Sequence, residues 1–314
     1  MARNKVQFQK GMSEAQFEDL YGTEALCHDA LVRWRWPEGF ECPECTGCGH
    51  CIVRRGARTL YQCNTCRKQT SVKAGTVFAS SKLPLRLWFK AMYLITQSKK
   101  GISSIELGRR LGVIQTTAWC LKHKLAQVMI ERNASMRLEG EVQMDDAYIG
   151  GHRPGTYGRG AAGKTPFVAA VAMTSDDKPD QIALRRVAGF SKKAIAKFAG
   201  KTLAAGVHAV SDALNCFTAG QRSRMHPYPG QDWQRSQGGQ KSALQMGQHR
   251  PGQYQGRHNG NLQSRACQAC AAYLAEFEYR FNRRYRLDTM IGRLAYVSLR
   301  TPPMPYRLLK LADV

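Results

Sequence analysis

The sequence predicts a mixed α/β protein in which a small cysteine-rich module and a helical region precede a larger sheet. Three observations support this fold class: closely spaced cysteine pairs, apolar residues at helical spacing from about residue 80, and alternating strand and helix patterns beyond residue 138. An order of strand, strand, strand, helix, strand is typical of mixed α/β domains. We therefore divide the chain into a helical lead-in at 1–40, the cysteine-rich module at 41–72, a helical region at 80–132 and an α/β domain at 138–314.

The charge balance indicates a polyanionic partner. The 314 residues include 47 Lys and Arg against 23 Asp and Glu, which gives a net charge of +24. This excess favours nucleic acid, and a membrane surface is the weaker alternative because no basic amphipathic helix stands apart from other signals. No apolar run reaches the roughly 18 residues that a membrane span needs, and the N-terminus lacks the apolar core of a signal peptide. We expect a cytoplasmic protein without membrane contact.

The lead-in carries a helix-start signal and several aromatic residues. Residues 12–17 have a capping-box pattern, which predicts the first turn of a helix. Trp34, Trp36 and Phe40 approach the first cysteine, and we expect them to pack onto the cysteine-rich module.

The module contains two C-x2-C pairs, Cys42-Pro43-Glu44-Cys45 and Cys63-Asn64-Thr65-Cys66, with seventeen residues between them. Cytosolic thiols are kept reduced, so clustered cysteines indicate metal binding before disulfides. Four thiolates suit tetrahedral zinc and leave no open position for catalysis. The sequence therefore predicts structural Zn²⁺ on Cys42, Cys45, Cys63 and Cys66. Cys48 and Cys51 form a third pair and are the alternative ligands, although the proline and tyrosine at the outer pairs favour the outer four.

A pattern of helix, turn and helix follows the module. Residues 103–113 read as a helix that Ser103 caps and Gly112 ends, and residues 116–119 belong to a second helix. The pattern resembles a helix-turn-helix, whose second helix can enter the major groove of DNA. An ordinary helical hairpin is the alternative, but the net charge favours DNA contact. Lys122 and Lys124 in the second helix are the expected DNA-binding residues.

Acidic residues lie at two strands of the final domain. Strands are expected at 141–149, 167–173, 182–187 and 207–210, with a helix at 191–203. Asp145 and Asp146 lie in the first strand, and Asp212 follows the last. A buried carboxylate is costly unless a cation or hydrogen bonds compensate it, so acids here in a basic chain indicate a divalent metal; an acidic turn is the alternative. We expect Asp145 and Asp212 to lie side by side at one rim of the sheet.

Several of these motifs, in the same order, resemble bacterial insertion-sequence transposases of the zinc-ribbon family with an ISXO2-like transposase domain. The cysteine pairs carry this resemblance together with Ala74-Gly75-Thr76-Val77-Phe78, Thr117-Ala118-Trp119, the run from Asp145 to Gly151, Val210-Ser211-Asp212 and Tyr279-Arg280-Phe281-Asn282-Arg283-Arg284-Tyr285. The resemblance implies a ribonuclease-H-like catalytic domain with an Asp-Asp-Asn or Asp-Asp-Glu triad.

The resemblance also implies a metal-dependent mechanism. Asp145 and Asp212 would hold Mg²⁺ or Mn²⁺ ions that activate water, or a freed DNA 3′-hydroxyl, for in-line attack on a phosphodiester. Asp146 occupies a position where the family keeps a second acid, and it is the weaker ligand. Basic residues after the strand would contact DNA phosphates, with a solvated loop as the alternative, and these residues are Arg153, Arg159 and Lys164.

The chain departs from the family between residues 220 and 270, where the third metal ligand is expected. This segment is rich in Gln, Gly, Arg and His and contains no Ile, Val, Phe, Thr or Glu, which predicts a loop or disorder and neither strand nor helix. The segment also fits translation out of frame: read one base later, the codons of Met246 and Gly247 give tryptophan, and the next codons permit the asparagine of the family run. A compensating shift is then expected between Arg265 and Ala271, and a lineage-specific loop is the alternative.

These observations favour an insertion-sequence transposase that binds terminal inverted repeats and target DNA, cleaves and transfers strands, and assembles as a homo-oligomer on DNA at the bacterial nucleoid. The missing third ligand favours an inactive descendant, or a zinc-ribbon and helix-turn-helix DNA-binding protein without catalysis. A nuclease of the same fold is a third alternative. Divalent-metal-dependent cleavage of a DNA end would distinguish an enzyme from a binding protein.

Overall fold

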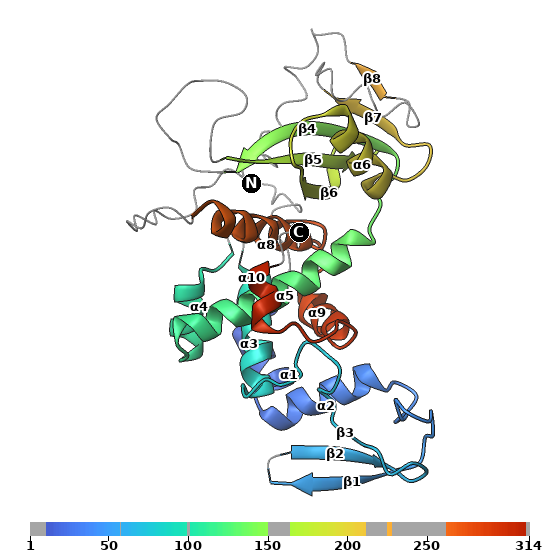
Figure 1. Cartoon of the computed structure of the whole chain (residues 1–314), viewed down its shortest axis with the longest axis vertical. Helices are drawn as coiled ribbons and strands as arrows, with labels where there is room; N and C mark the ends of the chain where they lie inside the picture. Colours follow the sequence, from blue (N-terminus) through green and yellow to red (C-terminus); the bar gives the residue numbers. More distant parts are fainter. Residues whose placement is uncertain are drawn as a thin grey trace, which may run out of the picture. The chain divides into compact units, whose positions relative to one another are not determined.

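The computed structural model describes residues 11–56, 58–98, 101–149, 164–211, 225–227 and 262–311. The chain forms two compact units (Figure 1). The first unit combines Met1–Val128 with Arg283–Leu311, and the second is built on Met129–Asn282. Among the described helices, none is long and apolar enough to cross a lipid bilayer.

Two capped helices begin the first unit. α1 (Glu14–Tyr21) starts at Ser13, whose hydroxyl accepts from the Gln16 amide while the Gln16 side chain accepts from the Ser13 amide. This reciprocal pair confirms the predicted capping box and satisfies amides that lack a partner in the first helical turn. α2 (Glu24–Arg35) is capped in a similar way by Thr23.

A three-stranded antiparallel sheet follows, in the order β1 (His50–Arg55), β2 (Arg58–Cys63) and β3 (Gln69–Thr70). Trp36 and Phe40 pack against it as predicted, because their ring centroids lie 4.9 and 5.8 Å from that of Tyr61 in β2. The prediction is wrong for Trp34, whose ring centroid lies 6.1 Å from that of Phe89 in α3 (Leu85–Gln97). Trp34 therefore joins α2 to the helical core instead of to this sheet.

The helical core of the first unit is built around α3. The N-terminus of α3 has no side-chain cap of its own, and the Glu24 carboxylate of α2 accepts from the amides of Leu85 and Arg86 at 2.8 and 2.9 Å. A carboxylate at this end also stabilises the helix through its dipole. Trp88 and Met92 of α3 are buried in the core. The next two helices are α4 (Ser104–Leu111) and α5 (Gln115–Ala134).

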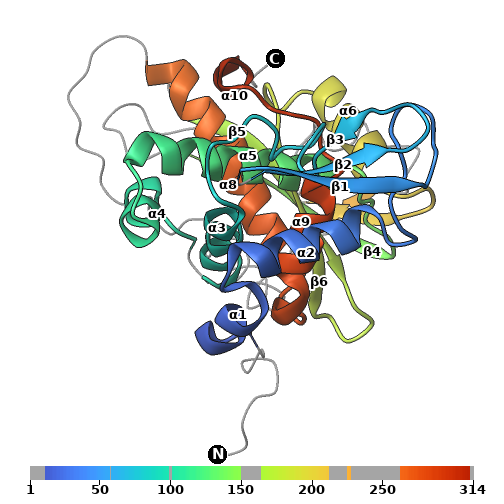
Figure 2. The ribbon, with the colours of Figure 1, turned by 90° about the horizontal axis from the view of Figure 1, so that it is seen from below.

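The C-terminal segment completes the core of the first unit. It contains the short 3-10 helix η2 (Leu287–Thr289), α9 (Met290–Ser298) and α10 (Tyr306–Leu311). α9 lies beside α2 and α3 (Figure 2), and four of its apolar side chains are fully buried: Met290, Ile291, Leu294 and Ala295. The Gln97 side chain donates to the Leu287 carbonyl at 2.9 Å. Residues 283–311 therefore fold with the first unit, although the sequence pattern grouped them with the sheet.

The second unit contains a five-stranded mixed sheet in the order β6-β5-β4-β7-β8 (Figure 1). Its strands are β4 (Glu141–Ile149), β5 (Thr165–Met173), β6 (Pro179–Arg186), β7 (His208–Ser211) and β8 (Met225–Pro227). β4, β5 and β6 form an antiparallel meander, whereas β7 pairs parallel with β4 and β8 pairs parallel with β7. The four predicted strands and the predicted helix, α6 (Lys192–Thr202), are confirmed.

Side-chain alternation divides this sheet into two packed faces. On one face, Val142 and Met144 of β4 pack in the same cluster as Phe198 of α6. On the other face, Phe167 of β5 packs with Leu274 of α8 (Leu262–Phe281). Each face of the central strand β4 is therefore covered by a different helix.

Part of the compositionally unusual segment 220–270 has regular structure. It contributes β8 and the first residues of α8, so the expectation of neither strand nor helix is wrong for these parts. The side chain of Cys270 is buried in the same cluster as Leu274, one helical turn further along α8. Residues 228–261 lie outside the described part of the chain, as do Arg153, Arg159 and Asp212.

Candidate metal centres and nucleic-acid surface

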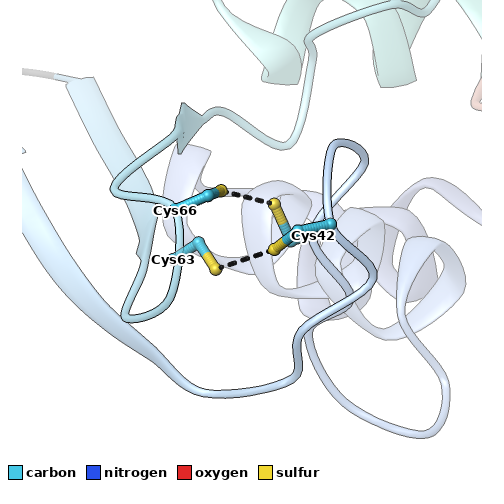
Figure 3. Close-up of side chains that lie close together, drawn as sticks. Cys42, Cys63 and Cys66 are labelled. Carbon is cyan, nitrogen blue, oxygen red and sulfur yellow. Dashed lines mark hydrogen bonds between the residues drawn. The ribbon is translucent and has the colours of Figure 1, made fainter.

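The four predicted zinc ligands form one cluster in the first unit. The Sγ atoms of Cys42, Cys45, Cys63 and Cys66 all lie within 4.8 Å of one another. The Cys42–Cys66 and Cys45–Cys63 pairs are each 3.5 Å apart, and Figure 3 shows the sulfurs turned toward one centre. In a tetrahedral site with Zn–S bonds of about 2.3 Å, the sulfurs would be about 3.8 Å apart. The cluster therefore has the donor set and the size of a structural zinc site.

Backbone hydrogen bonds fold each cysteine pair into a tight loop. The Cys42 amide donates to the Gly47 carbonyl at 3.1 Å, and the Cys63 amide donates to the Lys68 carbonyl at 2.9 Å. The residue after the second cysteine of each pair has a left-handed backbone, with φ of 57° at Thr46 and 60° at Arg67. Two loops with the same local turn thus aim two thiols each at the same point.

The surrounding backbone favours thiolates at two of these positions. Hydrogen bonds from the amides of Cys66 and Thr65 lower the pKa of Cys63 to about 6, and amides of Cys45 and Glu44 lower the pKa of Cys42. The Lys68 amide favours the thiolate of Cys66, but desolvation and the thiols of Cys45, Cys42 and Cys63 oppose it and raise the pKa of Cys66 to about 12. Four thiols this close need a cation before all of them can ionise.

The alternative ligands do not join the cluster. Cys48 and Cys51 are both exposed, and the Cys48 thiol lies 3.9 Å from the Thr46 carbonyl oxygen. Cys51 lies in β1, where it pairs with Gln62 of β2. Within the described residues, the outer two pairs are the ones that converge.

The second candidate centre lies on β4 of the second unit. This strand continues beyond Asp145 to Ile149, so the expectation that Asp145 lies at the rim of the sheet is wrong. Asp145 and Asp146 are half-buried and face Ala169 and Val168 of β5 across the antiparallel ladder. Side chains alternate along a strand, so the two carboxylates point to opposite faces of the sheet. One cation near a single face therefore can take only one of them as a ligand.

The parallel neighbour of β4 ends immediately before the other predicted ligand. Met144 of β4 pairs with Ser211 of β7, and both residues are buried. Asp145 follows Met144 in the chain and Asp212 follows Ser211, although Asp212 itself lies outside the described residues. The two strands are adjacent, as expected. Their register pairs Met144 with Ser211, which are the residues that precede Asp145 and Asp212 in the chain.

Two carboxylates of α8, which covers the face of the sheet to which Asp145 belongs, are paired with arginines. Glu278 is fully buried, accepts from the Leu184 amide at 3.0 Å and forms an ion pair with Arg185. Glu276 is paired with Arg280 one turn further along the helix. Glu278 thus joins α8 to β6, whereas the ion pair of Glu276 lies within α8 itself.

The predicted helix pair of the first unit is compact and rigid. Gly112 ends α4 with a left-handed backbone at φ of 66°, and the Val113 amide returns to the Gly108 carbonyl at 3.0 Å. A Cβ atom on Gly108 would meet the Val113 carbonyl oxygen at 2.9 Å, so only glycine permits this close approach. Leu107 and Ala118 are fully buried between the two helices.

Both lysines predicted to bind DNA turn toward their own unit. Lys122 donates to the carbonyl of Ile102. The Lys124 ammonium lies 5.9 Å from the ring centroid of Trp88, and burial lowers the pKa of Lys124. Ile114, which immediately precedes α5, and the first two residues of the helix, Gln115 and Thr116, are exposed instead. The sequence could have indicated these exposed residues, because the helix break at Gly112 determines where the second helix begins. Lys164, the remaining predicted contact within the described chain, is half-buried just before β5.

Comparison with known proteins agrees with this two-part organisation. Residues 22–69 match the transposase zinc-ribbon domain, and residues 137–282 match the ISXO2-like transposase domain. The chain is 27% identical over 130 residues to an uncharacterized protein in transposable element ISH50 of Halobacterium salinarum. This match covers 40% of the chain and 42% of that relative, so the chain spans about two fifths of its length. The resemblance drawn from the sequence motifs is confirmed.

Proposed function

We propose that this chain is the transposase of an insertion sequence, which binds the terminal inverted repeats and uses divalent metal ions to cleave DNA and join it to a target. The observation that carries the proposal is the parallel pairing of β4 with β7, because it aligns the chain positions that precede Asp145 and Asp212. The match of residues 137–282 to a transposase domain supports the same interpretation.

The sheet order supports a ribonuclease-H-like catalytic domain. A meander of three antiparallel strands is followed by a helix and then by a strand that pairs parallel with the first strand of the meander. This arrangement places β4 between β5 and β7, and Asp145 pairs with Ala169 of β5 one position beyond the last pair of β4 with β7.

The donor set suits a hard divalent cation. Carboxylate oxygens are the ligands that Mg²⁺ and Mn²⁺ prefer, and Asp145 and Asp212 would supply them. When bound, two such ions polarise the phosphodiester and activate water, or a freed 3′-hydroxyl, for in-line displacement at phosphorus. The attacking oxygen forms a bond to phosphorus as the bond to the leaving oxygen breaks. Asp146 lies on the opposite face of the sheet and is a ligand only for a differently placed ion.

DNA would be held by both units. In the second unit, Lys164 and the two arginines before it, Arg153 and Arg159, would contact phosphates. In the first unit, the contacts of Lys122 and Lys124 with Ile102 and Trp88 leave them less able to reach DNA than the exposed start of α5. Structural zinc on the four-cysteine cluster would hold the ribbon together. We propose that the protein acts as a homo-oligomer on DNA in the bacterial cytoplasm, at the nucleoid.

The missing third ligand favours a second candidate function for this particular chain, that of a DNA-binding protein without catalysis. The family run that supplies the ligand is absent from residues 220–270. We propose that two compensating frameshifts removed it, so the chain as written binds DNA but does not cleave it.

The test compares the chain as written with a chain in which the reading frame is restored across this segment. Both are incubated with a duplex from either end of the element, with Mg²⁺ or with EDTA. We expect both chains to bind the duplex and only the restored chain to cleave it, in a metal-dependent reaction. Binding without cleavage by the restored chain would favour the DNA-binding protein, and cleavage by the chain as written would overturn the missing-ligand proposal.

A further inference from the structure

The start of α5 is presented to solvent by a fixed support. Ala118 and Leu121 of α5 and Leu107 and Leu111 of α4 are all buried, and a Cβ atom on Gly108 of α4 would lie 3.5 Å from the Cβ of Ala118. The Ala118 amide donates to the Ile114 carbonyl at 3.1 Å, which closes the first turn of the second helix. The side chains on that turn therefore have a fixed backbone beneath them.

Three side chains at this position are exposed together. Ile114 is 73% exposed, the highest value among the large apolar side chains exposed on the described surface. Gln115 and Thr116 beside it are exposed as well, and the Gln115 amide makes no hydrogen bond to any residue that the structure describes. Burial of this apolar side chain against a partner would be favourable. Gln115 and Ile114 also line a hollow of about 430 Å³ between the two helices.

The charges around this turn suit a polyanion. Arg109 and Arg110 are exposed in the last turn of α4, beside the hollow, within a chain of net charge +24. Arg110 also forms an ion pair with Glu106 at 2.7 Å, and Arg109 lines the hollow itself. Positive side chains beside the first turn are suitably placed for the phosphates on either side of a groove.

The turn that follows is partly covered within the unit. Trp119 stacks on His123 with centroids 3.9 Å apart, and Tyr306 of α10 lies edge-on to Trp119 at 6.1 Å. Within residues 115–128 of α5, the exposed residues are Gln115 and Thr116 of the first turn. The residues at the start of a second helix in this motif are also the ones that reach base edges.

We infer that Ile114 and Gln115 read an A·T base pair and its neighbour in the major groove of duplex DNA, an inference that rests on the proposed function. A glutamine amide is complementary to adenine, since it donates to N7 and accepts from N6. An exposed isoleucine beside it fits the C5-methyl group of thymine. Arg109 supplies a phosphate contact that positions the turn without reading sequence.

The experiment selects binding sites for the full chain from a random duplex library and then modifies the selected site. Replacing the contacted adenine by 7-deazaadenine removes N7, and replacing the contacted thymine by uracil removes its methyl group. We expect the first change to weaken binding roughly 10-fold and the second several-fold, on the scale of single base contacts. The unmodified protein is used in these measurements, so folding of a variant does not affect them.

Variants then assign each effect to a side chain. Gln115→Ala should lose the penalty for 7-deazaadenine and keep that for uracil, whereas Ile114→Ala should lose the penalty for uracil and keep that for 7-deazaadenine. Gln181→Ala in β6 of the second unit is the matched control and should keep both penalties. Equal penalties in wild type and Gln115→Ala, or sites selected without a fixed A·T pair, would overturn the inference and leave DNA binding intact. A chain that binds no DNA at all would overturn the proposed function as well.

Discussion

Met144 of β4 and Ser211 of β7 are paired residues in the parallel ladder of the second unit, and both are buried. The next residue in each strand direction is an aspartate, Asp145 after Met144 and Asp212 after Ser211. Two chain segments separated by more than 60 residues are thus brought together one position before their carboxylates. Residues 165–203, which include β5, β6 and α6, form the connection that makes this pairing possible.

This pairing predicts different effects for the two acids of β4. In the frame-restored chain, Asp145→Asn should lower metal-dependent strand cleavage at least about 10³-fold, because the loss of a ligand removes several kcal/mol of charge stabilisation. Asp146→Asn should have a smaller effect, because its side chain lies on the other face of the sheet. Cleavage is measured on an end-labelled duplex, and binding of the same duplex should not change. Equal losses in the two variants would contradict the assignment of Asp145 as the ligand.

A second prediction concerns zinc. Metal analysis of the purified chain should find about one zinc per molecule, and Cys63→Ser should lose it, because a site with three thiolates and a hydroxyl holds zinc more weakly. Cys48→Ser is the matched control and should retain the metal, since Cys48 is exposed outside the cluster. A chain that keeps full zinc with Cys63→Ser, or that loses it with Cys48→Ser, would indicate the inner pair as ligands.

A third prediction concerns the turn between α4 and α5. Gly112→Ala should lower the free energy of unfolding of the first unit by roughly 1–2 kcal/mol, because a side chain at φ of 66° is strained. Site-specific DNA binding should fall with it, since the start of α5 is no longer held in place. Gly189→Ala is the control: no atom lies within 4 Å of its added Cβ, so urea unfolding should be nearly unchanged. An unaffected Gly112→Ala variant would show that the turn tolerates another backbone.

A fourth prediction follows because the C-terminal segment, residues 283–311, folds as part of the first unit. Leu294 of α9 is fully buried, so Leu294→Ala should lower the free energy of unfolding by about 2–5 kcal/mol. Tyr296→Ala, at an exposed position of the same helix, should have a much smaller effect. Residues 1–128 expressed alone should be destabilised for the same reason, and a peptide of residues 283–311 should restore their folding. Stable folding of residues 1–128 without the peptide would contradict this view of the core.

The features that could be predicted from sequence depend on neighbouring residues. The capping box at Ser13, the strands around Asp145 and the two cysteine pairs are set by spacings of a few positions, and all of them form as expected. Contacts between residues that are far apart in the sequence could not be predicted from such local spacings. Gln97 meets Leu287 across 190 residues, and no local pattern indicates that residues 283–311 leave the sheet for the helical core. The orientation of Lys124 likewise depends on which side of α5 faces α3, and only the packing determines this.

The last prediction concerns the reading frame behind residues 220–270. If two compensating shifts occurred, the alternative frame should contain no stop codon and should encode asparagine across the codon of Gln248 and the first base of His249. The second, compensating shift is expected between Arg265 and Ala271. Resequencing the gene tests this directly. A stop codon in the alternative frame, or the absence of the asparagine codon, would rule out the frameshifts and leave a lineage-specific loop. If the alternative frame is open, the chain that carries it should regain cleavage, and Asp145→Asn should abolish that cleavage. The third ligand would then be restored to a sheet in which the residues before Asp145 and Asp212 are already paired.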